Sequence, residues 1–323
     1  MSVMLFLGAG ASRAFDYPTT VEFLKIAKEN IHNTRTFDYV VQFLEGRDGP
    51  NNIDIEKVLW ELTDFYNCFT TIEEQGGFKK WMFFDNNLLG DSGTHRQFVN
   101  EIKKLRDKIY ELVYHTYWKR DFKKSNQTYR KLFNSIKGPV DIFTTNYDLC
   151  VEYAFWSDTQ LKDLFYDGFD YDKVDVCWKP QGYETPQYRL YKLHGSLNWK
   201  YGEDGKILRF NRRDIWDPQA QVMLYPGFKG EPKEQHYQFL HEQLTNKLNK
   251  STHCIAIGFS FRDDAINKIF KNAFSVNKGL RILIWNPGVV ETEFPKQRVI
   301  QFQKPFGEDT IEEGLSKITT TSQ

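Results

Sequence analysis

The sequence predicts an α/β protein with a Rossmann-like, doubly wound and mainly parallel sheet, interrupted by a large helical insertion after the first strand. Three observations predict this fold. Several short apolar runs have the length and composition of buried parallel strands. Stretches of helical periodicity separate these runs, which favours right-handed crossover connections. A length of 323 residues is enough for one such domain with an insertion.

Five apolar runs are predicted to be the strands, and they cover residues 3–7, 140–143, 188–193, 254–257 and 280–285. Each run ends in a polar or glycine-containing turn. Ligands of doubly wound proteins bind beyond the carboxyl ends of the strands. We therefore expect the functional residues directly after each run.

The chain is predicted to divide into a sheet domain of residues 1–26 and 134–306 and a helical insertion of residues 27–133. Within the insertion, one helix face is apolar at three- and four-residue steps, at Phe98, Ile102, Leu105, Ile109 and Leu112. This module can cover a ligand cleft, make oligomer contacts or only add packing. Residues 307–323 are expected to be a polar tail whose end frays.

Positive and negative side chains are balanced, with 43 Lys and Arg against 43 Asp and Glu, so no overall basic field draws the protein to nucleic acid. One local basic cluster is typical of a solvated helix face, and it consists of Lys119, Arg120, Lys123, Lys124, Arg130 and Lys131. Direct nucleic-acid binding is therefore not expected. No apolar run approaches the length of a membrane span, which predicts a cytoplasmic protein without a membrane segment.

The cysteines are far apart in the sequence, at Cys68, Cys150, Cys177 and Cys254. No pair has the C-x-x-C spacing that a structural zinc site or a redox motif needs. We therefore expect reduced thiols and no zinc.

The first strand is followed by the segment Gly8-Ala9-Gly10-Ala11-Ser12-Arg13. Glycines allow a tight turn and a close approach to a pyrophosphate, and Ser12 and Arg13 can contact the anion at the start of the next helix. The dinucleotide-binding fingerprint has a third glycine where Arg13 stands, so the match to that pattern is incomplete. A tight turn that simply requires small residues is the alternative.

Hydrogen-bonding side chains follow the next two runs. The segment Thr144-Thr145-Asn146-Tyr147-Asp148 comes after residues 140–143, and His194-Gly195-Ser196 comes after residues 188–193. Polar side chains at a strand end are costly to bury in an apolar core but suit a binding site. Asn146 or Asp148 can instead cap a helix, and a lone histidine is often structural.

Two later strand ends carry further polar groups. The segment Gly258-Phe259-Ser260-Phe261-Arg262-Asp263-Asp264 leads from a strand into a helix, and Asp264 is expected to cap that helix. The last predicted strand ends in Trp285-Asn286-Pro287-Gly288, where the Asn286 amide can bind a ribose hydroxyl.

Together these five strand ends resemble the sirtuin superfamily. The segment from Gly8 to Ser12 resembles its first glycine motif, Thr145-Asn146-Tyr147-Asp148 its T-x-N-x-D motif, and His194-Gly195 its catalytic histidine–glycine pair. Gly258-x-Ser260 is similar to the later glycine–serine motif of the family, and Asn286 to the asparagine that contacts the adenosine ribose. The resemblance covers residues 3–20 and 138–290 and leaves the insertion unexplained.

Two departures indicate a divergent branch of that superfamily. The chain lacks the two C-x-x-C pairs of the zinc module in the protein deacylases, and it has Tyr17-Pro18-Thr19-Thr20 where the family has a proline-aspartate-phenylalanine-arginine segment. It looks like the prokaryotic branch whose members resemble NAD hydrolases of antiviral defence. The resemblance therefore implies NAD as the substrate, no zinc and no deacylation.

The resemblance also implies residue roles. Asn146 would hold the attacking water at the anomeric carbon, His194 would accept a proton, and Asp148 would orient this pair or contact the nicotinamide ribose. The pyrophosphate would lie against Gly8, Ala9, Gly10, Ser12 and Arg13. The cofactor site would be completed by Thr145 and Gly258 and, on the adenosine half, by Ser260 and Asn286.

Two other functions stay open at the level of the sequence. The same cleft can serve as a non-catalytic sensor of NAD or an ADP-ribose derivative that drives assembly, or it can transfer ADP-ribose to an acceptor. An enzyme that depletes NAD needs restraint, and the chain has no obvious regulatory domain. We therefore expect a homo-oligomer or a regulatory partner. The resemblance suggests a motor ATPase or an Argonaute-type protein, with the insertion as the candidate docking surface.

Overall fold

The computed structural model describes residues 2–31, 35–74, 95–118, 121–136, 138–172, 175–210, 221–224 and 234–319. Lys119 and Arg120 of the predicted basic cluster lie outside these residues, as does the end of the predicted tail at 320–323. No described helix combines the length and the apolar character that a membrane crossing requires.

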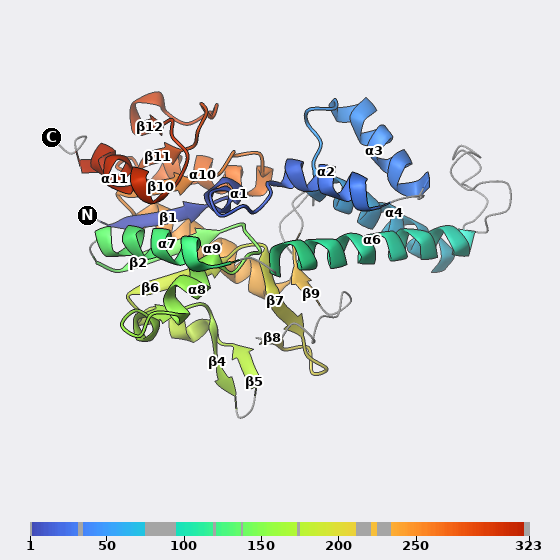
Figure 1. Ribbon diagram of the computed structural model, residues 1–323, viewed down its shortest axis with the longest axis horizontal. Coiled ribbons are helices and arrows are strands. Elements are labelled where there is room, and N and C mark those ends of the chain that lie inside the picture. Colours follow the sequence, from blue (N-terminus) through green and yellow to red (C-terminus); the bar gives the residue numbers. More distant parts are fainter. Residues whose placement is uncertain are drawn as a thin grey trace. The chain divides into compact units, whose positions relative to one another are not determined.

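A seven-stranded sheet is the core of the fold (Figure 1), and every described pair of neighbouring strands in it is parallel. The strand order is β12-β11-β10-β1-β2-β6-β3. The predicted fold class is therefore confirmed. The strands are β1 (Val3–Leu7), β2 (Val140–Thr144), β3 (Phe165–Tyr166), β6 (Tyr188–Lys192), β10 (His253–Ile257), β11 (Arg281–Trp285) and β12 (Val299–Phe302).

The first strand of the chain occupies the middle of the sheet. β1 pairs with β2 on one side and with β10 on the other, so the chain builds the sheet outward in both directions from β1. In doubly wound folds, ligands bind at the carboxyl end of the strand where this reversal occurs. The β1 carboxyl end continues into Gly8 and the short helix α1 (Ala9–Arg13).

Both faces of β1 are buried, which explains why its sequence is a continuous apolar run rather than an alternating one. Met4 and Phe6 belong to one hydrophobic cluster, and Leu5 and Leu7 belong to a second. All four side chains are 0% exposed. The sheet therefore has a core on each face.

Helices cover both of these faces. α9 (Gln235–Lys250) and α10 (Asp264–Val276) contribute buried side chains to the cluster that contains Met4 and Phe6. α7 (Lys123–Ser135), α8 (Cys150–Trp156) and α11 (Ile311–Thr319) contribute to the cluster that contains Leu5 and Leu7. α11 lies in the stretch predicted as a polar tail, where Ile311 and Ile318 provide the apolar face that packs.

A smaller antiparallel sheet with the strand order β4-β5-β8-β7-β9 arises from the part of the chain rich in Gly, Pro and aromatic residues. Its strands are β4 (Phe169–Asp172), β5 (Asp175–Trp178), β7 (Gly195–Tyr201), β8 (Ile207–Arg209) and β9 (Gln221–Met223). The rings of Phe169, Trp178 and Trp199 pack with centroids 5.0–5.5 Å apart. Short 3-10 helices occupy Lys162–Leu164, Pro180–Glu184, Lys296–Arg298 and Glu308–Thr310.

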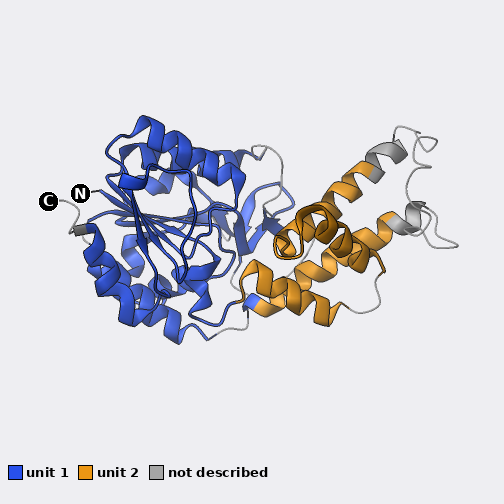
Figure 2. Ribbon diagram, turned by 90° about the horizontal axis from the view of Figure 1, so that it is seen from above, with its two compact units in different colours: residues 1–17, 117–224, 229–323 blue, residues 18–116, 225–228 orange. Residues whose placement is uncertain are grey.

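The chain divides into two compact units (Figure 2). The first unit comprises residues 1–17, 117–224 and 229–323 and contains both sheets, and the second comprises residues 18–116 with 225–228. The second unit contains α2 (Thr20–Asn30), α3 (Arg35–Asp48), α4 (Ile55–Glu74) and all but the end of α6 (His95–Trp118).

These limits differ from the predicted insertion, residues 27–133, at both ends. α2 contacts α4 and so belongs to the helical unit, whereas α7 contacts α8 and packs on the sheet. α2 begins before the predicted start of the insertion because Thr19 and Glu22 form a capping box, in which Glu22 Oε2 accepts from the Thr19 N–H at 2.9 Å.

Candidate functional site

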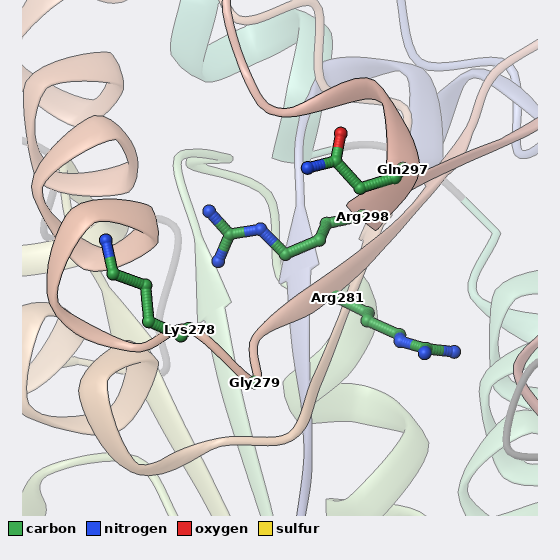
Figure 3. A pocket seen from close by; sticks show the side chains of 5 residues that line it. All are labelled: Lys278, Gly279, Arg281, Gln297 and Arg298. Atoms are coloured by element: carbon green, nitrogen blue, oxygen red, sulfur yellow. The ribbon is translucent and has the colours of Figure 1, made fainter.

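Polar groups gather at both ends of the parallel strands. At the amino end of β11, a cavity of about 600 Å³ is lined by Lys278, Gly279, Arg281, Gln297 and Arg298 (Figure 3). The residues predicted from the sequence lie at the opposite, carboxyl end of the strands.

The cations of this cavity do not converge on one point. Arg298 donates to the carbonyl oxygens of Phe274 at 2.9 Å and Asn277 at 3.0 Å, and its guanidinium lies 4.8 Å from the centre of the Phe274 ring. The side chains of Arg298 and Arg281 point in opposite directions in Figure 3. Arg298 therefore caps the C-terminal end of α10, whose last carbonyl groups need hydrogen-bond donors.

Three glycines bring the turn after β1 against the loop after β10. The Gly10 N–H donates to Gly258 O at 2.9 Å, and the Gly8 N–H donates to Ile257 O at 2.9 Å. A Cβ on Gly8 or Gly10 would lie 2.6 or 2.7 Å from backbone atoms of Gly258, and Gly258 itself has φ of 65°. The close packing of these two backbones is therefore sufficient to require glycine at all three positions.

The side chain of Asn146 is anchored to the same turn. Asn146 Nδ2 donates to Gly8 O at 2.9 Å and to Ser12 Oγ at 3.1 Å, and Ser12 Oγ donates to Asp148 Oδ2 at 2.7 Å. Ser12 and Asp148 are buried, whereas Asn146 is half-buried. Both anchoring bonds use Nδ2, so Asn146 Oδ1 has no hydrogen-bond partner among the residues that the structure describes. Residues predicted from two separate motifs thus form one network.

The backbone of the Asn146 segment is also fixed. Thr144 Oγ1 donates to Leu7 O at 3.0 Å and accepts from the Asn146 N–H at 3.0 Å, and the Thr145 N–H donates to Leu7 O at 3.2 Å. Asp148 Oδ1 accepts from the Cys150 N–H at 3.0 Å, which satisfies a free amide at the start of α8. The Asp148 carboxylate therefore has two roles. It stabilises the start of α8, as a helix cap does, and it takes part in the hydrogen-bond network around Asn146.

His194 pairs with a carboxylate from a distant segment. His194 Nε2 lies 3.1 Å from Asp263 Oδ2, and the histidine is 2% exposed. Asp263 Oδ1 accepts from the Ile266 N–H at 3.0 Å and so caps α10. Burial alone would raise the pKa of Asp263, but the hydrogen bond and charge of His194, the hydrogen bond from the Ile266 N–H and the charge of His241 together outweigh it, and the pKa is lowered. Asp263 is therefore ionised at neutral pH.

The pairing with Asp263 selects the tautomer of His194. An ionised carboxylate can only accept, so a neutral His194 carries its proton on Nε2 and keeps a lone pair on Nδ1. His194 Nδ1 is buried and has no hydrogen-bond partner within the described part of the chain. The arrangement therefore leaves Nδ1 able to accept a proton, with Asp263 opposite to balance the resulting charge.

The His194 segment adjoins the Asn146 segment because β2 and β6 are neighbouring strands. The Leu193 N–H donates to Thr144 O at 2.8 Å, and the rings of Tyr147 and His194 lie 6.4 Å apart. The carboxyl ends of two adjacent strands thus bring Asn146 and His194 into one region.

The other predicted residues lie at the same end of the strands with fewer contacts. Asn286 Nδ2 donates to Phe259 O at 2.9 Å and ties the end of β11 to the loop after β10. Ser260 is exposed and makes no hydrogen bond to any residue that the structure describes, and Arg13 is the exposed last residue of α1. The half-buried members are Ala9, Gly10, Thr145, Gly258 and Asn286.

Sequence reasoning misses Asp263 as the partner of His194 and wrongly assigns the cap of α10 to Asp264. Asp263 is the N-cap, and Asp264 is the exposed first residue of the helix. Two adjacent acids are equally good caps in the sequence, and the start of the helix decides between them. A carboxylate at a strand-to-helix turn was the signal that could have pointed to Asp263.

No group of three or more His, Cys, Asp or Glu side chains that could hold a metal ion occurs among the described residues. The four cysteines are free thiols, with Cys68 exposed and the other three buried. The contacts around Asn146 and His194 are made by amide, hydroxyl, imidazole and carboxylate groups.

Residues 140–297 match the family model of the SIR2-like domain. This segment includes β2, β6 and β10 and the residues Asn146, His194, Gly258 and Asp263, whereas Gly8 and Ser12 precede it. No curated protein matches the chain.

Among solved structures, the chain is similar to a mutant Sir2 homologue in complex with 2′-O-acetyl-ADP-ribose, with 12% identity over 99% of this chain and 92% of that one and a TM-score of 0.48. A Sir2 homologue in complex with NAD gives 13% identity over 100% and 91% of the two chains and a TM-score of 0.42.

Proposed function

We propose that this chain, whose residues 140–297 form a SIR2-like domain, binds NAD as its substrate and hydrolyses the bond between nicotinamide and ribose. One observation carries the proposal. His194 and the anchored amide of Asn146 follow the carboxyl ends of the adjacent parallel strands β6 and β2, where doubly wound proteins bind ligands, and Asp263, after β10, pairs with His194. The SIR2-like domain and the motifs it contains support NAD as the ligand.

The chemistry requires a placed water, a base and charge stabilisation. Nicotinamide departs with the electron pair of the C1′–N bond as a neutral molecule, so no acid is needed, and positive charge develops on the ribose C1′. A water molecule then forms the new C1′–O bond and loses a proton. The products are nicotinamide, ADP-ribose and one proton.

The contacts around Asn146 and His194 fit these requirements. Asn146 Oδ1 accepts a hydrogen bond from the attacking water, because its Nδ2 is committed to Gly8 and Ser12. His194 Nδ1 takes the water proton, and Asp263 stabilises the imidazolium that results. Asp148 acts by holding Ser12 and through it Asn146.

The rest of the same sheet edge would bind the remainder of NAD. We propose that the pyrophosphate lies against Gly8, Ala9, Gly10 and Arg13, with Thr145 beside them. The adenosine half would lie against Gly258, Ser260 and Asn286. Because the hydrolysis needs only the groups named here, we propose that no zinc takes part.

The test is NAD consumption by the purified protein, with nicotinamide and ADP-ribose quantified. We expect His194→Ala and Asn146→Ala each to lower the rate by about 10²- to 10⁴-fold, the usual contribution of a positioned base or of water placement. Thermal unfolding of each variant establishes that the fold is intact.

Three outcomes would change the assignment. Full NAD cleavage in either folded variant would remove that residue from the mechanism. Wild-type protein that binds NAD and leaves it intact would be a sensor rather than an enzyme. Nicotinamide release accompanied by a mass increase on an added acceptor would make the reaction an ADP-ribosyl transfer.

The NAD-cleaving activity of such an enzyme has to be controlled by something other than the site itself. We propose that assembly into a homo-oligomer or a regulatory protein, such as a motor ATPase or an Argonaute-type protein, controls it in the cytoplasm. The motif resemblance supports a role in antiviral defence.

An acetylated peptide is not expected to accelerate NAD loss.

A further inference from the structure

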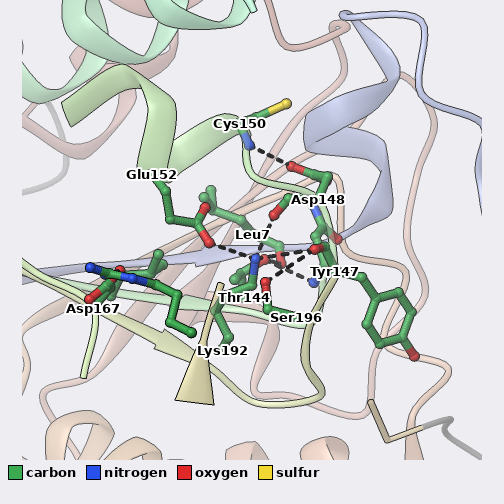
Figure 4. Close-up of polar contacts among 12 residues, drawn as sticks. Leu7, Thr144, Tyr147, Asp148, Cys150, Glu152, Asp167, Lys192 and Ser196 are labelled. Atoms are coloured by element: carbon green, nitrogen blue, oxygen red, sulfur yellow. Dashed lines mark hydrogen bonds and ion pairs between the residues drawn. The ribbon is translucent and has the colours of Figure 1, made fainter. Parts of the chain in front are cut away.

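Lys192 is a buried lysine beside the candidate site. It is the last residue of β6 and is 1% exposed. Lys192 Nζ lies 2.8 Å from Glu152 Oε1 on α8, and Glu152 is 2% exposed. The same Nζ donates to the carbonyl oxygens of Tyr147 at 3.3 Å and of Asp148 (Figure 4).

These three contacts use the full donor capacity of the ammonium group, which has three N–H bonds and no acceptor. Removing an ammonium and a carboxylate from water is costly, and an apolar pair of similar volume is often equally stable. A fully satisfied buried charge therefore needs a reason other than stability. Two of its three acceptors are backbone carbonyls that directly follow Asn146.

The Asn146–Asp148 segment is held from two sides. Gly8 and Ser12 hold the Asn146 side chain, as described above. On the other side, Tyr147 O accepts from Lys192 Nζ and from the Leu197 N–H at 3.1 Å. Lys192 and Leu197 flank His194 in the sequence, so the segment that carries His194 is itself the support of the Asn146 segment.

We propose that Lys192, paired with Glu152, is a positioning residue that fixes the Asn146 segment relative to His194. The proposal rests on the proposed function for its catalytic consequence. Lys192 does not touch the reacting atoms, and it acts through the backbone at Tyr147 and Asp148. Glu152 supplies the counter-charge of the buried ammonium group.

The experiment compares two variants of the full chain. Lys192→Met/Glu152→Leu replaces both charges by apolar side chains of similar volume and leaves the Tyr147 and Asp148 carbonyls without their shared donor. Glu152→Gln keeps Lys192, its two backbone contacts and an acceptor oxygen at position 152. Melting temperature, NAD kinetics and hydrogen exchange of amides 144–150 are measured for each.

We expect the double variant to melt lower only by the loss of the donor to the Asp148 carbonyl, but to lose about 10²-fold in kcat, the scale of an ångström-sized misplacement, with KM for NAD little changed. Its amides 144–150 should exchange faster. Glu152→Gln should melt lower because the buried ammonium has lost its counter-charge, yet keep its kcat and its slow exchange.

The matched control is Asp167→Leu/Arg209→Met, which removes another ion pair of the same unit, between the buried Asp167 and the half-buried Arg209, that does not contact the Asn146 segment. This control should leave kcat and the exchange of amides 144–150 unchanged.

A double variant of Lys192 and Glu152 with wild-type kcat and slow exchange would overturn the proposal. If that variant does not fold, Glu152→Gln still tests the proposal. A kcat of Glu152→Gln that falls together with its melting temperature would mean that the pair has only a structural role. If the wild type does not cleave NAD, the proposed function fails on its own. The exchange data then test the positioning role alone.

Discussion

Asp263 uses its two carboxylate oxygens for two different tasks. Oδ1 caps α10 through the Ile266 N–H, and Oδ2 lies against His194 Nε2. An asparagine is as good an N-cap as an aspartate, but it has no negative charge to stabilise an imidazolium. The two tasks can therefore be separated by one substitution.

We expect Asp263→Asn to leave the melting temperature nearly unchanged and to lower the rate of NAD cleavage by about 10²-fold or more. The asparagine keeps the cap but no longer fixes the Nε2-protonated tautomer of His194. Kinetics and thermal unfolding of the purified variant are the measurements.

Asp264→Asn is the matched control, because Asp264 is adjacent, exposed and makes no hydrogen bond to the described residues. It should retain the wild-type rate. Equal losses in the two variants would show that the His194–Asp263 contact is unimportant for turnover.

Individual residues of the candidate site were predictable to the extent that their chemistry appears in a local motif. Asn146 and His194 follow apolar runs directly, so they stood out in the sequence. Asp263 and Lys192 did not, because their roles depend on partners in other segments, His194 and Glu152. The pairing of two residues far apart in a chain has no signature in either local sequence.

The contact between the β1–α1 turn and the loop after β10 depends on the absence of side chains. A Cβ on Gly258 would lie 2.0 Å from Ala11 N, and the φ of Gly258 is 65°. The two backbones in contact follow directly from the paired central strands β1 and β10.

We expect Gly258→Ala to lower the free energy of unfolding by about 2–4 kcal/mol, because steric overlap adds to a left-handed backbone conformation. Chemical denaturation measures this change. Gly288→Ala is the matched control, since a Cβ there would meet nothing within 4 Å and φ is not positive. That variant should stay within about 0.5 kcal/mol of the wild type. A Gly258→Ala protein as stable as the control would mean that the two backbones can separate cheaply.

Strands were predictable from the sequence where both of their faces are buried. The five apolar runs correspond to β1, β2, β6, β10 and β11, with limits that differ by at most a residue at either end. β12 was missed because Val299, Ile300 and Gln301 are only half-buried on the sheet edge and the strand is short. The antiparallel sheet was not among the predicted elements, since its order depends on aromatic packing between segments distant in sequence.

The stability of the whole molecule should depend on pH through its buried histidines. Burial lowers the pKa of His236 from 6.5 to about 4, and burial together with the charge of Arg281 lowers the pKa of His253. An unfolded chain takes up these protons near pH 6.5, whereas the folded chain does so only at lower pH. The stability is therefore fully present above pH 6.5 and is lost as the pH falls toward 4.

We expect the free energy of unfolding to fall by about 1–3 kcal/mol between pH 7 and pH 4.5, since each unit of pKa shift is worth about 1.4 kcal/mol. His236→Phe, which cannot take up a proton, should reduce this fall. The pKa of Asp263 is also lowered, but Asp263 is a carboxyl group, so its stabilisation is full above the ordinary pKa of an aspartate and is lost as the pH falls from there through the lowered pKa. Denaturation curves at the two pH values measure the difference, and an identical fall in wild type and His236→Phe would assign it to other groups.

Because β1 lies in the middle of the sheet, it cannot pair with its neighbours until much more of the chain has been synthesised on the ribosome. β1 is made first, but its neighbours β2 and β10 begin only at Val140 and His253. At about 5–20 residues per second, the nascent chain carries an unpaired, wholly apolar strand for on the order of ten seconds before β2 emerges. During that interval the segment Val3–Leu7 is an exposed target for chaperones and for other nascent chains.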